Sequence, residues 1–171
     1  MQTTDTGIGP VNLWLHSLFS QVDLSLNDRL VTSSTNTYPY RAYLETLLSY
    51  GPAAKKSHLT SALWYKDSYA HMDEVGDNNQ GFIKRKKWIL ESKLVSMIGK
   101  PHLDLFFQDR LLLNGVDIKM RLVRSKDTFS VMGAGKVHIK DAVLVVRKVK
   151  VHPSVQGVSK NSGPIQNGIT F

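Results

Sequence analysis

The clearest hydrophobic pattern in the chain is that of an amphipathic helix over residues 37–51. Apolar side chains recur there at intervals of three and four residues, the spacing that lines up one face of a helix. They are Tyr40, Tyr43, Leu44, Leu47 and Leu48. Thr37 is placed to cap the helix, and Gly51 followed by Pro52 ends it. We therefore expect this stripe to pack against the interior of the protein.

Much of the remaining chain alternates apolar and polar residues, the two-residue period of a strand with one buried face. Residues 22–26 alternate and lead through Asn27-Asp28, a dipeptide suited to a tight turn, into residues 29–31. The apolar residues 111–113 lead into Asn114-Gly115, which is a strong hairpin signal, and residues 116–122 then alternate. Each of these two segments predicts a β-hairpin.

The other segments complete the prediction of a mainly-β fold. Further strands are expected over 93–97, 103–107 and 142–151, a short second helix over 57–65, and a long polar loop over 66–81. Many short strands with turn dipeptides and no βαβ alternation are typical of an antiparallel β-sandwich. We expect a sandwich of the jelly-roll type, partial, with one or two short helices inserted between strands.

The length of 171 residues predicts one domain. Its expected core covers residues about 10–153, between a loose lead-in over 1–9 and a loose tail over 156–171. No run is apolar for long enough to span a membrane, and the first residues lack the pattern of a secretion signal. The absence of cysteine removes thiolate chemistry and fits a reducing compartment. We expect an intracellular protein that is not secreted.

The basic balance of the chain raises the question of a polyanionic partner. The formal net charge is +8 and the isoelectric point is about 9.7. Four consecutive basic residues, Lys84, Arg85, Lys86 and Lys87, lie between Phe82 and Trp88. Basic side chains beside aromatic rings suit contact with nucleic acid. The alternative is a solvated segment that keeps a sheet edge soluble.

No motif predicts catalysis or a cofactor. Gly133-Ala134-Gly135-Lys136 lacks the earlier glycine and the following hydroxyl of a phosphate loop, so it is interpreted as a turn. There is no Gly-x-Ser-x-Gly elbow, and the adjacent acids Asp73 and Glu74 lie in the polar loop. We expect no enzyme activity, no cofactor and no small-molecule substrate.

Two residue pairs could each supply two metal ligands from one strand face. They are His102 with Asp104 and His71 with Asp73. A structural zinc site needs four ligands and a catalytic site usually three. The spacing of the other histidines indicates no third ligand, so no metal site is predicted.

Three long blocks of the sequence resemble a known family. They are PVNLWLHSLFSQVDLSLN over 10–27, SSTNTYPYRAYLETLLSYG over 33–51, and ESKLVSMIGKPHLDLFFQDRLLLNGVDIKMRLVRSKDTF over 91–129. They are similar to the major capsid protein of Polinton (Maverick) elements and the related adintoviruses, including copies integrated in animal genomes. The similarity extends from about residue 10 to residue 153.

The resemblance implies a structural role. Family members are double jelly-roll proteins that form trimeric capsomers in an icosahedral shell, so the expected partners are copies of the chain and other capsid proteins, and the expected location is the virion capsid. The resemblance implies that this chain is a fragment, part of the first jelly roll, as in a truncated or decayed genomic copy, and it is expected not to form stable trimers alone. The alternative function is a basic nucleic-acid-binding module acting through residues 84–87.

Overall fold

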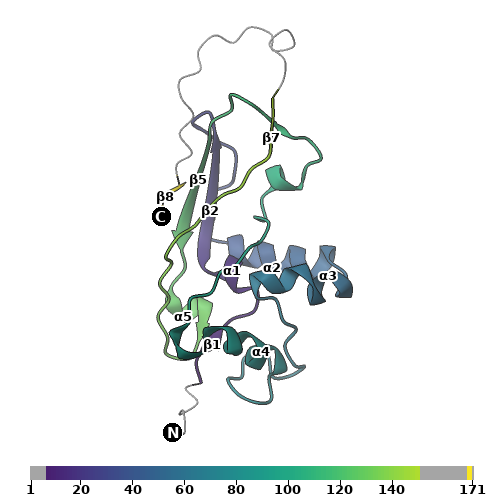
Figure 1. The fold of residues 1–171 in the computed structure, drawn as a ribbon, viewed down its shortest axis with the longest axis vertical. Helices are drawn as coiled ribbons and strands as arrows, with labels where there is room; N and C mark the ends of the chain where they lie inside the picture. The colour runs from purple at the N-terminus through teal and green to yellow at the C-terminus, as the bar shows by residue number, and fades with distance from the viewer. Residues whose placement is uncertain (1–6, 151–168, 171) are drawn as a thin grey trace.

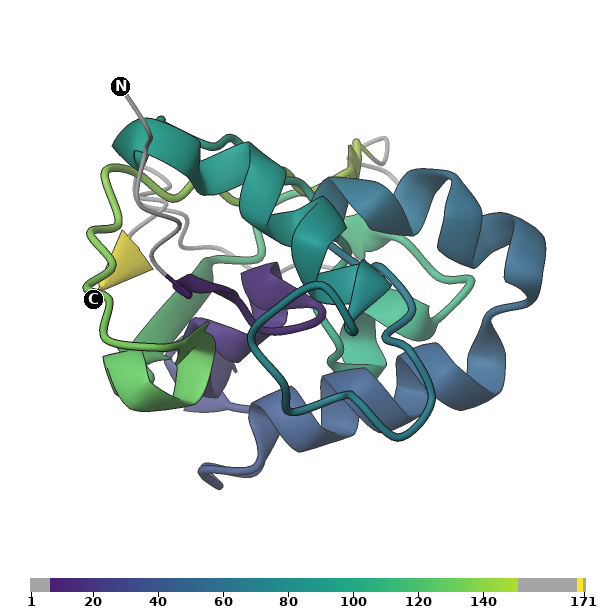
Figure 2. The same cartoon turned by 90° about the horizontal axis from the view of Figure 1, so that it is seen from below.

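An antiparallel pair of strands forms the middle of the molecule. The structure is a computed structural model that describes residues 7–150 and the backbone of 169–170. Strands β2 (Phe19–Leu26) and β5 (Ile118–Arg124) run along its long axis, while the helices gather toward the N-terminal end (Figure 1). Seen along that axis, α1 (Trp14–Ser17) lies at the centre, with α2 (Tyr38–Ser49) and α4 (Gln80–Ile89) on opposite sides (Figure 2).

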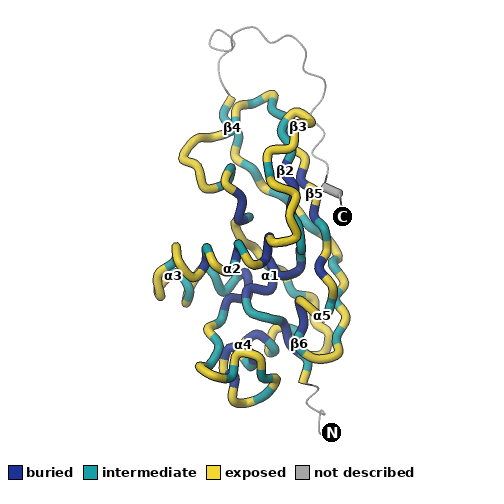
Figure 3. Tube along the Cα trace, turned by 180° about the vertical axis from the view of Figure 1, so that it is seen from behind, coloured by how far each residue is buried: buried dark blue, intermediate teal, exposed yellow. Residues whose placement is uncertain are grey.

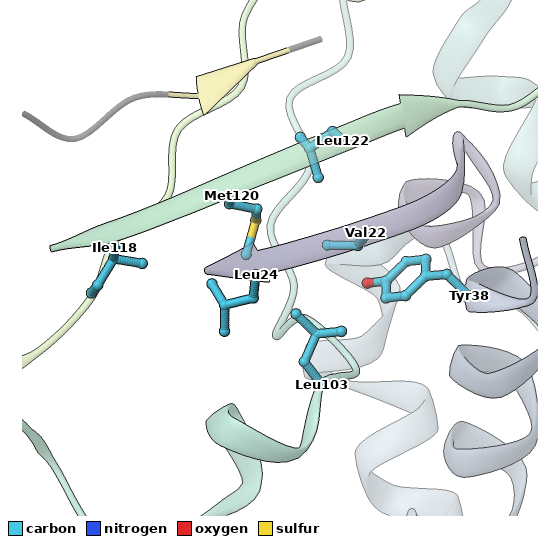
Figure 4. Close-up of a cluster of buried hydrophobic side chains, with 7 residues drawn as sticks. All are labelled: Val22, Leu24, Tyr38, Leu103, Ile118, Met120 and Leu122. Carbon is cyan, nitrogen blue, oxygen red and sulfur yellow. The ribbon is translucent and has the colours of Figure 1, made fainter. Parts of the chain in front are cut away.

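The register of β2 and β5 places their apolar residues on one face. Val22 is paired with Leu122, and Leu24 with Met120. The buried cluster that results is Val22, Leu24, Tyr38, Leu103, Ile118, Met120 and Leu122 (Figure 4). Lys119 on the other face of β5 is exposed. This alternation confirms the strand prediction for 22–26 and, from residue 118 onward, the one for 116–122, because burying one face is what drives a two-residue period.

The first predicted hairpin is present. Asn27 and Asp28 have φ angles of 48° and 63°, which a tight two-residue hairpin turn requires at both positions. The turn returns the chain into β3 (Arg29–Leu30), which pairs with the end of β2. Ile169–Thr170, strand β8, pairs in parallel with β5 on the opposite edge of this four-stranded sheet.

A second apolar cluster lies where α2 meets the chain around α1 and the short helix η1 (His58–Ala62). Leu13, Ala42, Ala62 and Trp64 form its buried centre. They come from the chain before α1, from α2 and from around η1, which follows α3 (Pro52–Lys56). The predicted helix over 57–65 is therefore a shorter 3-10 turn preceded by an α-helical turn. Ser57 does not cap it, because its hydroxyl hydrogen-bonds the carbonyl of Ala53.

Helix α4 closes the N-terminal end of the fold. Asn79 is fully buried and caps the helix, since its side-chain oxygen accepts a hydrogen bond from the Phe82 amide. The Phe82 ring rests on Gly9 so closely that a Cβ there would lie 2.4 Å from it. Gly9 belongs to β1 (Gly9–Pro10), which pairs with β6 (Val131–Met132). Strand β6 directly follows the short helix α5 (Asp127–Ser130) in the chain. The tip of α4 continues into η2 (Leu90–Ser92).

The prediction of a mainly-β, partial jelly-roll sandwich is wrong. The structure is 33% helix and 17% strand, with sheets of four, two and two strands among the described residues. Residues 93–97 form no strand, and 103–107 contain the 3-10 turn η3 (Asp104–Phe107). The polar segment 66–79 is a loop as predicted. An alternating apolar segment becomes a strand only when a neighbouring strand pairs with its backbone amides and carbonyls. In the described structure, no strand lies alongside residues 93–97 or 103–107 to supply that pairing.

The C-terminal segment shows the same limit of the pattern. Ala142, Leu144 and Val146 pack on the main core, while Val143 and Val145 are 75% and 85% exposed. Only β7 (Lys148–Val149) forms a ladder there, in parallel with β4 (Leu112–Leu113). The second predicted hairpin is therefore wrong in its pairing, since β4 joins β7 and not β5. Residues 1–6, 151–168 and 171, which include most of the predicted lead-in and tail, lie outside the described residues.

Candidate interaction surface

Helix α2 forms where the sequence predicts it but turns its other face inward. Its buried residues are Tyr38, Pro39, Ala42 and Thr46. The four residues that we call the outer stripe are Tyr40, Leu44, Leu47 and Leu48, and their exposed fractions are 59%, 57%, 42% and 85%. Tyr43 lies between the two faces and packs on the Trp64 ring at 5.4 Å. The prediction that the outer stripe is buried is wrong.

A buried polar network holds the inner face of α2 against the rest of the fold. The Tyr38 hydroxyl lies 2.9 Å from Nδ1 of His16 and accepts a long hydrogen bond, 3.4 Å, from the His102 amide. The two imidazole rings meet edge to face with centroids 4.7 Å apart. His16, Tyr38 and His102 are each less than 8% exposed. The network thus joins α1, α2 and the segment before η3 (Figure 3 shows the buried positions along α1 and α2).

The outer end of the network is ionic. Nδ1 of His102 lies 2.7 Å from Oε2 of Glu45, and its Nε2 lies 3.5 Å from the Thr46 hydroxyl. The guanidinium of Arg41 hydrogen-bonds Glu45 at 2.7 Å and also pairs with Asp104. Each charge therefore has a partner, which is the condition for keeping polar groups next to a core.

Burial sets the protonation of the two histidines. Desolvation, with a smaller contribution from His102, lowers the pKa of His16 to about 3. Desolvation also lowers the pKa of His102, although its hydrogen bond to Glu45 opposes the shift. Burial raises the pKa of the Tyr38 hydroxyl. Both imidazoles are consequently neutral at pH 7 and act as hydrogen-bonding spacers between α1 and α2.

This network explains why α2 presents its larger apolar residues to solvent. The inner face uses small or hydrogen-bonding side chains, Ala42, Thr46 and Tyr38, so that the helix lies close to the sheet and meets the histidines. Sequence reasoning missed it because hydrophobic periodicity weights large apolar residues. The available signal was a second set at the same helical spacing, Tyr38, Ala42 and Thr46, opposite to the first.

The four basic residues of the predicted nucleic-acid cluster do not share one surface. Arg85 is fully buried, whereas Lys84 and Lys87 are exposed on α4 and Lys86 is half-buried. Arg85 forms an ion pair with Asp67 at 2.8 Å and hydrogen-bonds the carbonyls of Pro10 and Tyr65, both at 2.9 Å. Arg85 is a structural residue that joins α4 to β1 and to the loop before it. Nucleic-acid contact at Lys84, Lys86 and Lys87 stays a prediction.

The candidate metal pairs are separated by the fold. His102 faces Glu45, while Asp104 turns to Arg41; His71 pairs with Glu74 at 2.8 Å. Within residues 7–150 no group of three or more histidine or acidic side chains is placed to hold a metal ion. Gly133, with a φ of 86°, lies in the predicted turn. Across the described part of the chain, no helix combines the length and apolar character of a membrane span.

The sequence of the chain is similar to that of a nematode protein. The chain is 31% identical over 121 residues to a Caenorhabditis elegans protein that carries the name uncharacterized protein F54H12.2. The matched part is 70% of this chain and 27% of that relative, so the chain corresponds to about a quarter of the relative's length. No protein-family model matches the chain, and no solved structure matches it.

Proposed function

We propose that the chain is part of a self-assembling structural protein of a virion capsid, and that the outer stripe of α2 makes contact between copies. The resemblance of residues 10–27, 33–51 and 91–129 to Polinton and adintovirus capsid proteins supports the capsid role. The exposed apolar face of α2 is the observation that supports self-association. The proposal does not require the jelly-roll architecture, which this chain lacks.

The three blocks that carry the resemblance meet in space. The main core takes Val22 and Leu24 from the first, Tyr38 from the second, and its other four residues from the third. The polar network likewise joins His16, Glu45 and His102, one from each block. Contact between the three most similar blocks is what a common core requires, and this favours a shared folding unit.

The outer stripe has the properties of a contact surface. Two turns of helix place Tyr40, Leu44 and Leu48 in line, with Leu47 beside them. Contiguous exposed apolar side chains are uncommon on isolated proteins and mark interaction sites. Each square ångström of apolar surface that a partner covers contributes about 25 cal/mol. Because the network fixes α2, the stripe is presented on a rigid element, which lowers the entropic cost of association.

Sedimentation velocity of the purified chain over a range of concentrations tests the proposal. We expect reversible, concentration-dependent association at pH 7. The double variant Leu44→Asp with Leu48→Asp should sediment as a monomer throughout, because two charges would have to be desolvated at the contact. Its thermal unfolding should stay close to that of the unaltered chain, since both side chains are mostly exposed.

Val143→Asp with Val145→Asp is the matched control. It adds the same charge at two apolar residues that are also exposed but lie outside α2. Association that survives in this control and disappears in the α2 variant supports the proposal. A chain that remains monomeric at all concentrations, or one that associates equally well with the two charges on α2, contradicts it.

A further inference from the structure

An open hollow lies beside the first turn of α2, on the side of α5. Its volume is about 390 Å³, within the range of small-molecule sites. Tyr40 and Phe129 form one wall, with ring centroids 5.7 Å apart and planes at 66°. Both rings are partly exposed, at 59% and 38%. Two aromatic faces at the edge of a hollow provide a surface on which a planar group can stack.

One hydroxyl in the lining of the hollow lacks a hydrogen-bond partner within the described residues, whereas the Ser20 hydroxyl bonds the Val123 carbonyl. This is the hydroxyl of Ser125, a residue that is only 8% exposed. An unsatisfied buried hydroxyl costs free energy that a ligand can recover. Asn36 and Thr128 add further hydrogen-bonding groups at the rim.

The charge of the hollow is positive. Lys126 lines it and, within residues 7–150, has no ion pair with a carboxylate. The neighbouring Asp127 is turned away, since its carboxylate pairs with Arg124 at 2.5 Å and accepts a hydrogen bond from the Val137 amide at 3.2 Å. The excess of basic residues over the whole chain, 22 against 14 acidic, adds a long-range attraction for polyanions.

We propose that this hollow binds a nucleotide unit of single-stranded nucleic acid. A base would stack on Tyr40 or Phe129, its edge would bond the Ser125 hydroxyl and Asn36, and Lys126 would contact the adjoining phosphate. Stacking and a nearby cation are the elements of single-strand binding without strong sequence preference. A duplex does not meet these conditions, because its bases are already stacked. The site is separate from Lys84, Lys86 and Lys87. It shares Tyr40 with the outer stripe, so binding is to be measured at a concentration where the chain is monomeric.

Fluorescence anisotropy with a labelled oligothymidylate tests this site on the full chain. Phe129→Ala should weaken binding about tenfold, since stacking is worth roughly 1–3 kcal/mol per base. Lys126→Gln should weaken it and also reduce the salt slope by about 0.7, the value for one phosphate contact of a single strand. Lys126 is exposed, so this variant separates loss of binding from loss of folding. The matched control is Lys84→Gln with Lys87→Gln, which removes two exposed lysines from α4.

We expect the Phe129 and Lys126 variants to lose much of their affinity for the oligonucleotide. The control should lose less than about twofold in affinity after allowance for net charge. Absence of binding to the unaltered chain overturns the proposal, as does loss confined to the Lys84 and Lys87 control. Oligoglutamate provides the other arm. If it displaces the oligonucleotide at equal charge concentration, the hollow recognises polyanions in general and the assignment to nucleic acid is wrong.

Discussion

The imidazole rings of His16 and His102 meet edge to face inside the protein, with centroids 4.7 Å apart. His16 comes from α1 and His102 from the segment before η3, so the contact joins parts of the chain that lie 86 residues apart. At this separation two protonated rings would repel each other in a medium that screens poorly. The fold therefore needs both rings neutral, and its stability depends on pH.

Acidification should destabilise the protein before the carboxylates titrate. In the unfolded chain a histidine binds its proton near pH 6.5, whereas the folded pKa of His16 is about 3. The unfolded state consequently binds more protons between these values, and stability falls as the pH drops from 6.5. His16 alone should lower the free energy of unfolding by about 2 kcal/mol between pH 6.5 and pH 5. Urea denaturation at a series of pH values measures this slope.

The variant His16→Gln identifies the origin of the slope. It lowers stability at pH 7 but should remove most of the dependence on pH between 6.5 and 5. His58→Gln, at an exposed position, is the control and should leave the slope as it is in the unaltered chain. Equal slopes for His16→Gln and the unaltered chain would contradict the assignment. Arg41, Glu45, Lys100 and Asp104 also act on His102 or its partners, but none of them is altered in this comparison.

Removal of Arg85 should destabilise the fold strongly. The change Arg85→Met keeps much of the side-chain volume but leaves Asp67 buried, with its side chain 9% exposed, and without its cation. Breaking a buried ion pair from one side typically costs 3–5 kcal/mol. Lys84→Met, on the exposed side of the same helix, should change stability by less than about 0.5 kcal/mol. Chemical denaturation compares the two, and similar losses would contradict a structural role for Arg85.

The sequence predicts correctly the elements whose contacts are local in the sequence, or whose apolar residues all face the core. The β2 turn at Asn27-Asp28 is a local signal, and the alternation of Ile118, Met120 and Leu122 records a face that is buried along its whole length. Helix α2 was also located correctly, because its spacing and its Gly-Pro end are local. These features need no knowledge of what lies opposite.

The rest depends on contacts between distant residues. Val143 and Val145 alternate with the core-facing Ala142, Leu144 and Val146 as in a strand, yet in the described part of the chain no strand accompanies most of that segment. Hydrogen bonds that join Tyr38 to His16 and His102, which lie 22 and 64 residues away in the sequence, determine which face of α2 is buried. Arg85 belongs to a basic run in the sequence, and only the fold gives it Asp67 as a partner. Periodicity does not encode any of these pairings.

The effect of adding a methyl group to a glycine should depend on the packing around it. In helix α4, Gly81 lies against the loop that holds Asp67, and a Cβ there would be 2.7 Å from the carbonyl oxygen of Lys66. Gly81→Ala should therefore cost about 1–3 kcal/mol by overpacking, although alanine is normally the better helix former. Gly51→Ala is the control, since a Cβ there meets nothing within 4 Å. It should be neutral or slightly stabilising, and thermal unfolding distinguishes the two.

Two leucines that look alike in the sequence should respond oppositely to truncation. Leu24 is fully buried in the main core with Tyr38, Leu103 and Met120, where its loss leaves a cavity as well as removing apolar contacts. Leu24→Ala should reduce the free energy of unfolding by about 3–5 kcal/mol. Leu48 lies on the outer stripe and is 85% exposed, so Leu48→Ala should change it by less than about 0.5 kcal/mol in the monomer.

The variant Leu48→Ala also separates folding from assembly. Leu48→Ala should shift sedimentation toward the monomer without altering the denaturation midpoint measured at a concentration where the chain is monomeric. A large loss of monomer stability in Leu48→Ala would mean that the outer stripe packs within its own chain, as its spacing first indicated. Unchanged monomer stability combined with weaker association would instead assign the stripe to contact between chains, because only a partner would then cover it.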